Sequence, residues 1–188
     1  MTASEPPRSK AKNAVGCAPR RGGSRAVYLR PMITLRDLQD SDHEAVLALR
    51  LAPGQRRFVS TVPESLAEAA EEPGAQAISW AVYRDETPVG FVMIADEVAE
   101  PYIPHYLWKL LIDERYQRQG VGTATLDLIV GYFLDRPDVD SITTSAAEGD
   151  GSPIPFYERY GFERTGEIHD QEVVLRLDLR KHEALGGH

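Results

Sequence analysis

The sequence predicts a mixed α/β (α+β) fold in which helices cover one central sheet. Two observations support this prediction: several strand-like segments come early, and strand-like and helix-like segments then alternate towards the end. We see no internal repeat and no second set of elements, and a chain of 188 residues suits a single core. We therefore expect one domain over residues 32–180, a leader at 1–31 and a tail at 181–188.

The first expected elements are a strand and two helices. Residues 32–38, MITLRDL, alternate apolar and polar side chains as a strand does. Residues 41–50 open with Ser-Asp, which favours a helix cap, and place acids in the first turn. After the interruption APGQRRFVS, residues 63–72 resume a helical pattern that starts at a proline and ends at Pro-Gly.

Three strands are expected next. Residues 79–84 (SWAVYR) and 88–95 (PVGFVMIA) flank a short turn, which predicts an antiparallel hairpin. Residues 105–112, HYLWKLLI, are apolar on both faces apart from Lys109, as in a central strand.

The last third of the domain alternates helices and strands. The helix after residue 122 carries an apolar stripe that packs on a sheet, made of Leu126, Ile129, Val130 and Phe133. A strand at 141–146 (SITTSA), a short helix at 152–160 (SPIPFYERY) and a final strand at 172–179 (EVVLRLDL) complete the prediction.

Charge is distributed unevenly along the chain. The net charge is −8, but residues 1–31 carry seven basic side chains and one acidic one, so the remaining residues carry −14. An acidic body argues against nucleic acid as a partner and favours small cations. No apolar stretch approaches the length of a membrane helix, so no membrane partner is expected.

The leader is basic and rich in Pro, Gly and Ser, without the apolar region of a secretory signal. We expect a disordered extension ahead of a domain that opens at Met32; the alternative is a tail that binds an anionic partner. Cys17 is the only cysteine, which excludes an intrachain disulfide and suits a cytoplasmic location. The five histidines are scattered without metal-ligand spacing, so no metal site is expected.

The run QRQGVG at residues 117–122 suggests a phosphate site. It stands between an apolar strand and the start of a helix, where unpaired N–H groups and the helix dipole attract anions. Two glycines let a ligand approach bare backbone, and Arg118 adds a cation. The third glycine of a dinucleotide fingerprint and the Gly-Lys-Ser/Thr of a P-loop are both absent.

This order of parts resembles the GNAT superfamily of acyl-CoA N-acyltransferases over residues 32–180. Its Q/R-x-x-G-x-G/A motif matches in full at 117–122, and its later Tyr-x-x-x-Gly-Phe matches at Tyr157, Gly161 and Phe162. The resemblance implies a mostly antiparallel sheet flanked by helices and splayed between the fourth and fifth strands.

The resemblance also implies acetyl-CoA as co-substrate. Backbone from Arg118 to Thr123 would hold its pyrophosphate, and the strand ending at Leu111 and Ile112 would bind the pantetheine, with a main-chain N–H near there facing the thioester carbonyl. The residues expected to bind it are Leu111, Ile112, Gln117, Arg118, Gln119, Gly120, Val121, Gly122, Thr123, Ser152 and Tyr157. Asp150 and Pro153 stand where the family has Asn and Ala, so contacts from this loop are the least certain.

Acetyl transfer needs a base for the ammonium of the acceptor and an acid for the leaving thiolate. By resemblance, Tyr157 is the acid, because a phenol keeps its proton at neutral pH. Glu97 and His105, at the ends of neighbouring strands, are the candidate bases, acting directly or through water.

The segments LWKLLIDERYQRQGVG and YGFERTGEIHDQEVVLRLDL are most similar to bacterial diamine and polyamine N-acetyltransferases. That similarity and the acidic body suggest a small cationic amine as acceptor, bound by carboxylates such as Glu167 and Glu172. Gln171 replaces an expected glycine, so the final hairpin is expected to differ.

The predicted function is therefore acetyl-CoA-dependent N-acetylation of a small amine in a ternary complex. Three alternatives stay open: another acceptor (an aminoglycoside-like antibiotic, an amino acid or a protein N-terminus), a non-catalytic acyl-CoA-binding regulatory domain, and a nucleic-acid-binding role of the leader. A homodimer is allowed but not indicated by any sequence feature.

Overall fold

The computed structural model describes residues 31–38, 43–96 and 103–186. Residues 1–30 of the predicted leader and the predicted cap residues at 41 and 42 lie outside this described part. The described residues form one sheet of seven strands in the order β1-β2-β3-β4-β5-β7-β6. The pairing is antiparallel between all neighbours except β4 and β5, which are parallel. The predicted mixed, mostly antiparallel sheet is confirmed.

The strands lie close to their predicted positions, with one addition. Their bounds are β1 Ile33–Asp37, β2 Ala77–Arg84, β3 Thr87–Ala95, β4 Tyr106–Ile112, β5 Ser141–Ala146, β6 Glu163–His169 and β7 Glu172–Asp178. The helices are α1 His43–Leu47, α2 Val62–Glu71, α3 Val121–Leu134, α4 Ile154–Tyr160 and α5 Leu179–Ala184, with short 3-10 turns η1 Gln55–Arg57, η2 Pro73–Ala75 and η3 Glu114–Tyr116.

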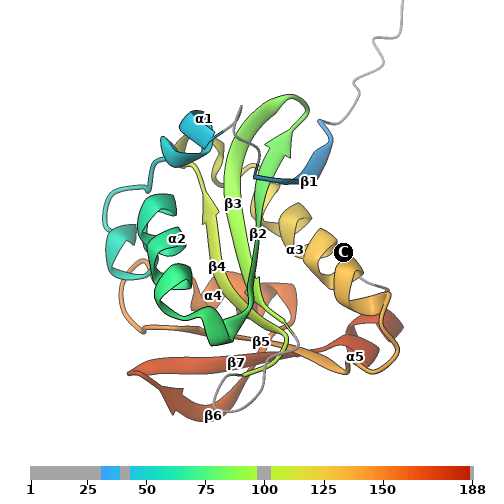
Figure 1. Ribbon diagram of the computed structural model, residues 1–188. Helices are drawn as coiled ribbons and strands as arrows, with labels where there is room; N and C mark the ends of the chain where they lie inside the picture. Colours follow the sequence, from blue (N-terminus) through green and yellow to red (C-terminus); the bar gives the residue numbers. More distant parts are fainter. Residues whose placement is uncertain (1–30, 39–42, 97–102, 187–188) are drawn as a thin grey trace, which may run out of the picture. The chain divides into compact units, whose positions relative to one another are not determined.

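The two faces of the sheet have separate cores. In Figure 1, α1 and α2 lie on one side of strands β2 to β4, and α3 lies on the other. The stripe predicted for α3 is buried, with Leu126, Ile129, Val130 and Phe133 each at most 4% exposed. On the opposite face, Val46 of α1 and Val62 of α2 pack with Phe91 and Met93 of β3. An amphipathic helix buries its apolar side because that removes apolar surface from water.

The sheet opens between its fourth and fifth strands. In the described chain these strands share one paired position, Tyr106 with Thr143, whereas β5 and β7 pair along six positions. The register of β4 against β3 also shifts at Trp108, which increases the local twist. Beyond Leu107, whose carbonyl still accepts from the Thr144 hydroxyl at 2.9 Å, β4 leaves its neighbour. The predicted splay is confirmed.

The end of the domain differs from the prediction in two ways. Residues 163–169 form the edge strand β6, which the apolar pattern did not indicate. A two-residue turn of Asp170 and Gln171 joins β6 to β7, both with positive φ (46° and 69°), as a type I′ hairpin requires. Residue 179, predicted as strand, begins α5, because the Asp178 side chain accepts from the Lys181 N–H at 2.8 Å and caps a helix.

Within the described residues, the helices are all too short or too polar to cross a membrane.

Candidate active site

A cavity of about 1190 Å³ lies where β4 and β5 separate. Its walls come from β4, the loop at 117–123, β5, α4 and the start of β7, together with the segment that precedes α2. Strand β4 contributes every residue from Trp108 to Ile112 to this lining. Because β5 has moved away there, the backbone of β4 can hydrogen-bond an extended ligand as an added strand does.

The start of α3 forms one end of the cavity. Gly120 is the N-cap, with φ of 82° that favours glycine, and Ala124 is the first residue to donate back to it, at 3.0 Å. The N–H groups of Val121, Gly122 and Thr123 therefore have no acceptor inside the helix. A Cβ on Gly122 would lie 3.2 Å from the ring of Phe156, so glycine is what keeps this wall open. These features fit a phosphate group at the helix terminus.

Most of the predicted cofactor residues meet at the cavity. Its lining includes Leu111, Ile112, Gln117, Arg118, Gly120, Gly122, Thr123, Ser152 and Tyr157. Two predicted residues have other contacts. The Gln119 side chain accepts from Arg84 and donates to the Arg115 carbonyl, both at 2.8 Å. The Val121 side chain is buried in the core, so that only its backbone belongs to the helix terminus.

Gln117 connects the loop before α3 to the segment before α2. Its Nε2 donates to the Ile112 carbonyl and to Oε1 of Gln55, both at 2.8 Å. Gln55 was not predicted as a site residue. Its only sequence signal is a position in the polar interruption between the first two helices.

The loop before α4 departs from the family pattern without placing an acid in the cavity. Asp150 is exposed and outside the lining, and its carbonyl accepts from Arg57. The Ser152 hydroxyl donates to the Ala147 carbonyl at 2.7 Å and accepts from the Ile154 N–H at 3.3 Å. Ser152 thus organises the turn into α4, with Pro153 as the N-cap.

Tyr157 projects from α4 into the core at the cavity wall and is 6% exposed. Its ring contacts Phe156 and Phe162, with centroids 5.3 and 5.4 Å away. Burial raises the pKa of Tyr157 well above its ordinary value; a hydrogen bond with Thr144 opposes this, and the charge of Glu172 adds to it. The phenol therefore keeps its proton at neutral and mildly alkaline pH.

Of the two predicted bases, only His105 belongs to the part of the chain that the structure describes. Glu97 lies outside the described residues. His105 lies outside the lining, and its Nδ1 is 2.9 Å from the buried Asp96 carboxylate. Burial alone would raise the pKa of Asp96, but hydrogen bonds from Arg136, His105 and Tyr132 lower it. This network holds His105 in place at the start of β4, at a φ of 53°, which favours a positioning role.

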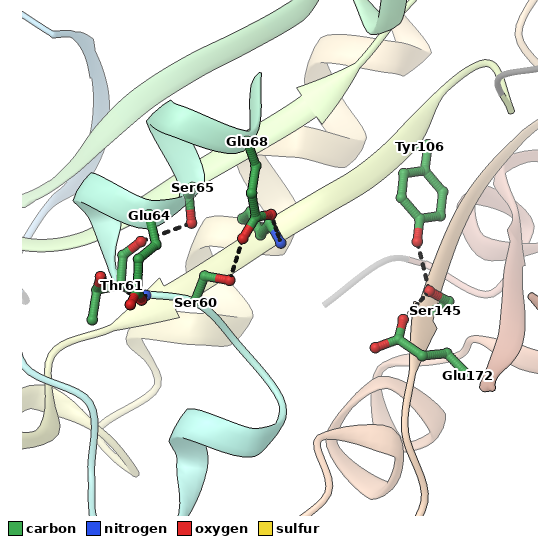
Figure 2. A network of polar contacts seen from close by, with 9 residues as sticks. Ser60, Thr61, Glu64, Ser65, Glu68, Tyr106, Ser145 and Glu172 are labelled. Carbon is green, nitrogen blue, oxygen red and sulfur yellow. Dashed lines mark hydrogen bonds and ion pairs between the residues drawn. The ribbon is translucent and has the colours of Figure 1, made fainter. Parts of the chain in front are cut away.

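At the other end of the cavity, Tyr106, Ser145 and Glu172 form a hydrogen-bonded row from three different strands (Figure 2). Glu172 thus lines the cavity, and its role in binding the acceptor stays a prediction. Glu167 is exposed on β6 and outside the lining. Tyr106 and Ser145 were not predicted, because only the order of the strands brings them next to Glu172.

The cavity lining carries charges of both signs. Arg118 comes from the loop before α3 and Arg159 from α4, whereas Glu72 follows α2 and Asp170 and Glu172 come from the final hairpin. Lys109, also in the lining, is paired with Glu68 of α2 at 2.6 Å. Among the described residues there is no group of three or more side chains suited to a metal ion.

Comparison with known proteins identifies the family. The model of the acetyltransferase (GNAT) family matches residues 33–162, more than half of the sequence. The chain belongs to the GNAT family. It is therefore an N-acetyltransferase, and the β4–β5 cavity with its helix terminus is the candidate active site of a GNAT enzyme.

Curated relatives of this GNAT enzyme include polyamine acetyltransferases at modest identity. It is 26% identical over 150 residues to the spermine/spermidine N(1)-acetyltransferase of Bacillus subtilis (strain 168), covering 77% of this chain and 97% of the relative. The probable spermine N(1)-acetyltransferase of Bacillus subtilis subsp. natto is 24% identical with the same coverage.

Solved structures share the fold. The aminoglycoside acetyltransferase AAC(6')-Ib in complex with paromomycin and acetyl-CoA has a TM-score of 0.64 at 17% identity, covering 82% of this chain and 98% of that one. The PaiA N-acetyltransferase from Thermoplasma acidophilum in complex with coenzyme A has a TM-score of 0.54 at 14% identity, covering 78% and 99%. At these identities the likeness concerns the fold.

Proposed function

We propose that this GNAT enzyme transfers the acetyl group of acetyl-CoA to a small cationic amine of the diamine or polyamine class. The observation that carries the proposal is a single cavity that has Arg118 and the open N-terminus of α3 at one end of β4, and the Glu172 carboxylate, bonded to Ser145 beside Tyr106, at the other. Phosphates suit the first end and an ammonium group suits the second. The similarity to spermine/spermidine N(1)-acetyltransferase supports the same acceptor class.

In this proposal the free backbone of β4 aligns the pantetheine, and a main-chain N–H near Leu111 or Ile112 faces the thioester oxygen. The attacking nitrogen forms a bond to the acetyl carbon, and the bond from that carbon to sulfur breaks. The first proton of the ammonium leaves to a base before the attack. The departing sulfur takes the proton of the Tyr157 hydroxyl, and Tyr157 recovers the second proton, which the nitrogen loses once the new bond has formed. Direct transfer in a ternary complex needs no acetylated residue on the enzyme.

Acceptor binding is assigned to the carboxylate end of the cavity. Glu172 and Asp170 lie in its lining and attract an ammonium group, while Glu167, exposed on β6 outside the lining, acts on the acceptor only at longer range. We place the reaction in the cytoplasm, since the single cysteine suits a reducing compartment.

The test is an acceptor panel with release of free thiol as the readout. Spermidine, spermine, putrescine, an aminoglycoside, free lysine and a peptide with a free N-terminus are each incubated with the full chain and acetyl-CoA. We expect thiol release with the polyamines and a product heavier by one acetyl group in mass spectrometry. Acetylation of the aminoglycoside or the peptide without polyamine turnover would reassign the acceptor. Thiol release equal to that without any amine would refute the transfer function.

A further inference from the structure

Tyr106, Ser145 and Glu172 come from β4, β5 and β7, and all three line the cavity. The Tyr106 hydroxyl lies 2.6 Å from the Ser145 hydroxyl, which in turn contacts a carboxylate oxygen of Glu172. Figure 2 shows the three side chains directed toward one another. A polar row of this kind, half-buried between diverging strands, needs an explanation beyond packing.

The direction of each hydrogen bond follows from which of the three groups carries a hydrogen to donate. An ionised Glu172 can only accept, so the Ser145 hydroxyl must donate its single proton to it. Ser145 then has only lone pairs for Tyr106, and therefore the Tyr106 hydroxyl donates to Ser145. The remaining lone pairs of the Tyr106 oxygen are left to accept a proton, at a residue that lines the cavity.

Glu172 lies near two phenols and near charged side chains of its own hairpin. Burial raises the pKa of Tyr106; the Ser145 hydrogen bond opposes this, and the charge of Glu172 adds to it, so the phenol keeps its proton at neutral pH. Tyr157, on α4, is also affected by the charge of Glu172. From the final hairpin, His169 and Asp170 also line the cavity beside Glu172.

We propose that Glu172 is the terminal proton acceptor of the reaction, and that Tyr106 and Ser145 relay to it the proton of the acceptor ammonium. One N–H bond of the ammonium breaks as its proton moves to the Tyr106 oxygen. The Tyr106 proton moves to Ser145 and the Ser145 proton to Glu172, so the two hydroxyls are restored and Glu172 becomes a neutral acid. Glu172 then returns the proton to solvent, and no oxidant or other reactant is needed.

This inference rests on the proposed acetyl transfer, and it assigns the base that Glu97 and His105 were expected to supply. It also separates two roles for Glu172. A mere counter-ion would bind the ammonium and leave its proton in place, whereas a base must make the amine neutral before attack. An aliphatic ammonium has a pKa of about 10, so at pH 7 only about one molecule in a thousand is neutral without help.

The test compares pH profiles of kcat/KM for spermidine, or for the amine of the panel that reacts fastest, at saturating acetyl-CoA. Glu172→Gln, Ser145→Ala and Tyr106→Phe each interrupt the relay with a small change of shape. Glu183→Gln and Ser141→Ala are matched controls, since Glu183 is exposed on α5 and both residues lie outside the cavity lining. Binding of coenzyme A, measured by calorimetry, verifies that each variant is folded.

We expect each relay variant to lose about 10²-fold in kcat/KM at pH 7, and the gap to wild type to shrink to about threefold near pH 10, where the amine is already neutral. The double variant of Tyr106→Phe with Glu172→Gln should lose little more than either single one, because both block the same path. A loss that is equal at every pH, or a profile identical to wild type, would refute the relay while leaving acetyl transfer intact. If wild type itself releases no thiol with any amine, the proposed function fails, and the relay with it.

Discussion

Replacing Asp113 with asparagine should destabilise the protein at neutral pH and reduce its sensitivity to acid. Asp113 follows β4 directly and is 0% exposed. Its carboxylate accepts from the N–H of Arg50 and of Arg115, both at 3.0 Å, and from the Arg115 guanidinium at 2.7 and 3.0 Å. Asp113 therefore joins the end of β4 to the segment after α1 and to the turn η3, which precedes the loop at 117–122.

The size of the effect follows from the pKa of Asp113. Burial by itself would raise it, but the hydrogen bonds from Arg115 and from the N–H of Arg50 outweigh burial and lower the pKa from 3.8 to about 2. That difference corresponds to about 2 kcal/mol of stability, at 1.36 kcal/mol for each pKa unit. Because the folded pKa is the lower one, this stability is present above about pH 4 and is lost as the pH falls toward 2, with about 1 kcal/mol gone by pH 3.

Urea unfolding followed by circular dichroism at pH 7 and pH 3 measures the effect. At pH 7 we expect Asp113→Asn to lower the free energy of unfolding by at least about 2 kcal/mol, because an amide also turns a donor toward Arg115. At pH 3 the difference should be smaller by about 1 kcal/mol, since wild type has lost part of the same stability. Asp138→Asn, at an exposed position, should stay within about 0.5 kcal/mol at both pH values. An Asp113→Asn difference that is the same at both pH values would refute the reasoning.

Three further predictions concern the cavity and the helix beside it. Tyr157→Phe should lower kcat about 10²-fold at pH 7 with KM for acetyl-CoA within about threefold; an unchanged kcat in steady-state assays would remove its role as acid. Gly122→Val should raise KM for acetyl-CoA by about tenfold or more, because even a Cβ there meets an aromatic ring at 3.2 Å, and calorimetric binding of coenzyme A checks this. Gly131→Ala, in open space inside α3, should raise the free energy of unfolding by about 0.5–1 kcal/mol in urea titrations, and a loss would contradict the helix geometry.

Most of the sheet could be predicted because its strands bury apolar side chains at regular intervals. Strand β6 is the exception: six of its seven residues are exposed, so its sequence, ERTGEIH, carries no apolar alternation. What makes it a strand is backbone pairing with β7 after a tight turn at Asp170 and Gln171. Helix α5 was missed for the opposite reason, since buried Leu179 continues the apolar pattern of β7 past the point where Asp178 caps a helix.

For the candidate site, sequence predicted the parts that depend on local backbone and not those that depend on strand order. The loop at 117–122 is contiguous, so Gly120 and Gly122 could be found from their spacing before a helix. Tyr106, Ser145 and Glu172 are far apart in sequence, and meet because β5 lies between β4 and β7 in the sheet. Periodicity describes which face a side chain takes, but it does not give the order of strands.

Strand β4 serves both ends of the cavity, and each end of this strand is held by a buried carboxylate. Asp96 binds His105 just before the strand begins, and Asp113 binds backbone and guanidinium groups just after it ends. Hydrogen bonds lower the pKa of both carboxylates despite their burial, so both stay charged at neutral pH. With one paired position to β5, the strand is held by six paired positions with β3 and by these two carboxylates at its ends. These contacts together fix the separation between Tyr106 at one end and the backbone of Ile112 at the other. In the proposed reaction, that separation decides whether an amine bound near Tyr106 can reach a thioester bound beside Ile112.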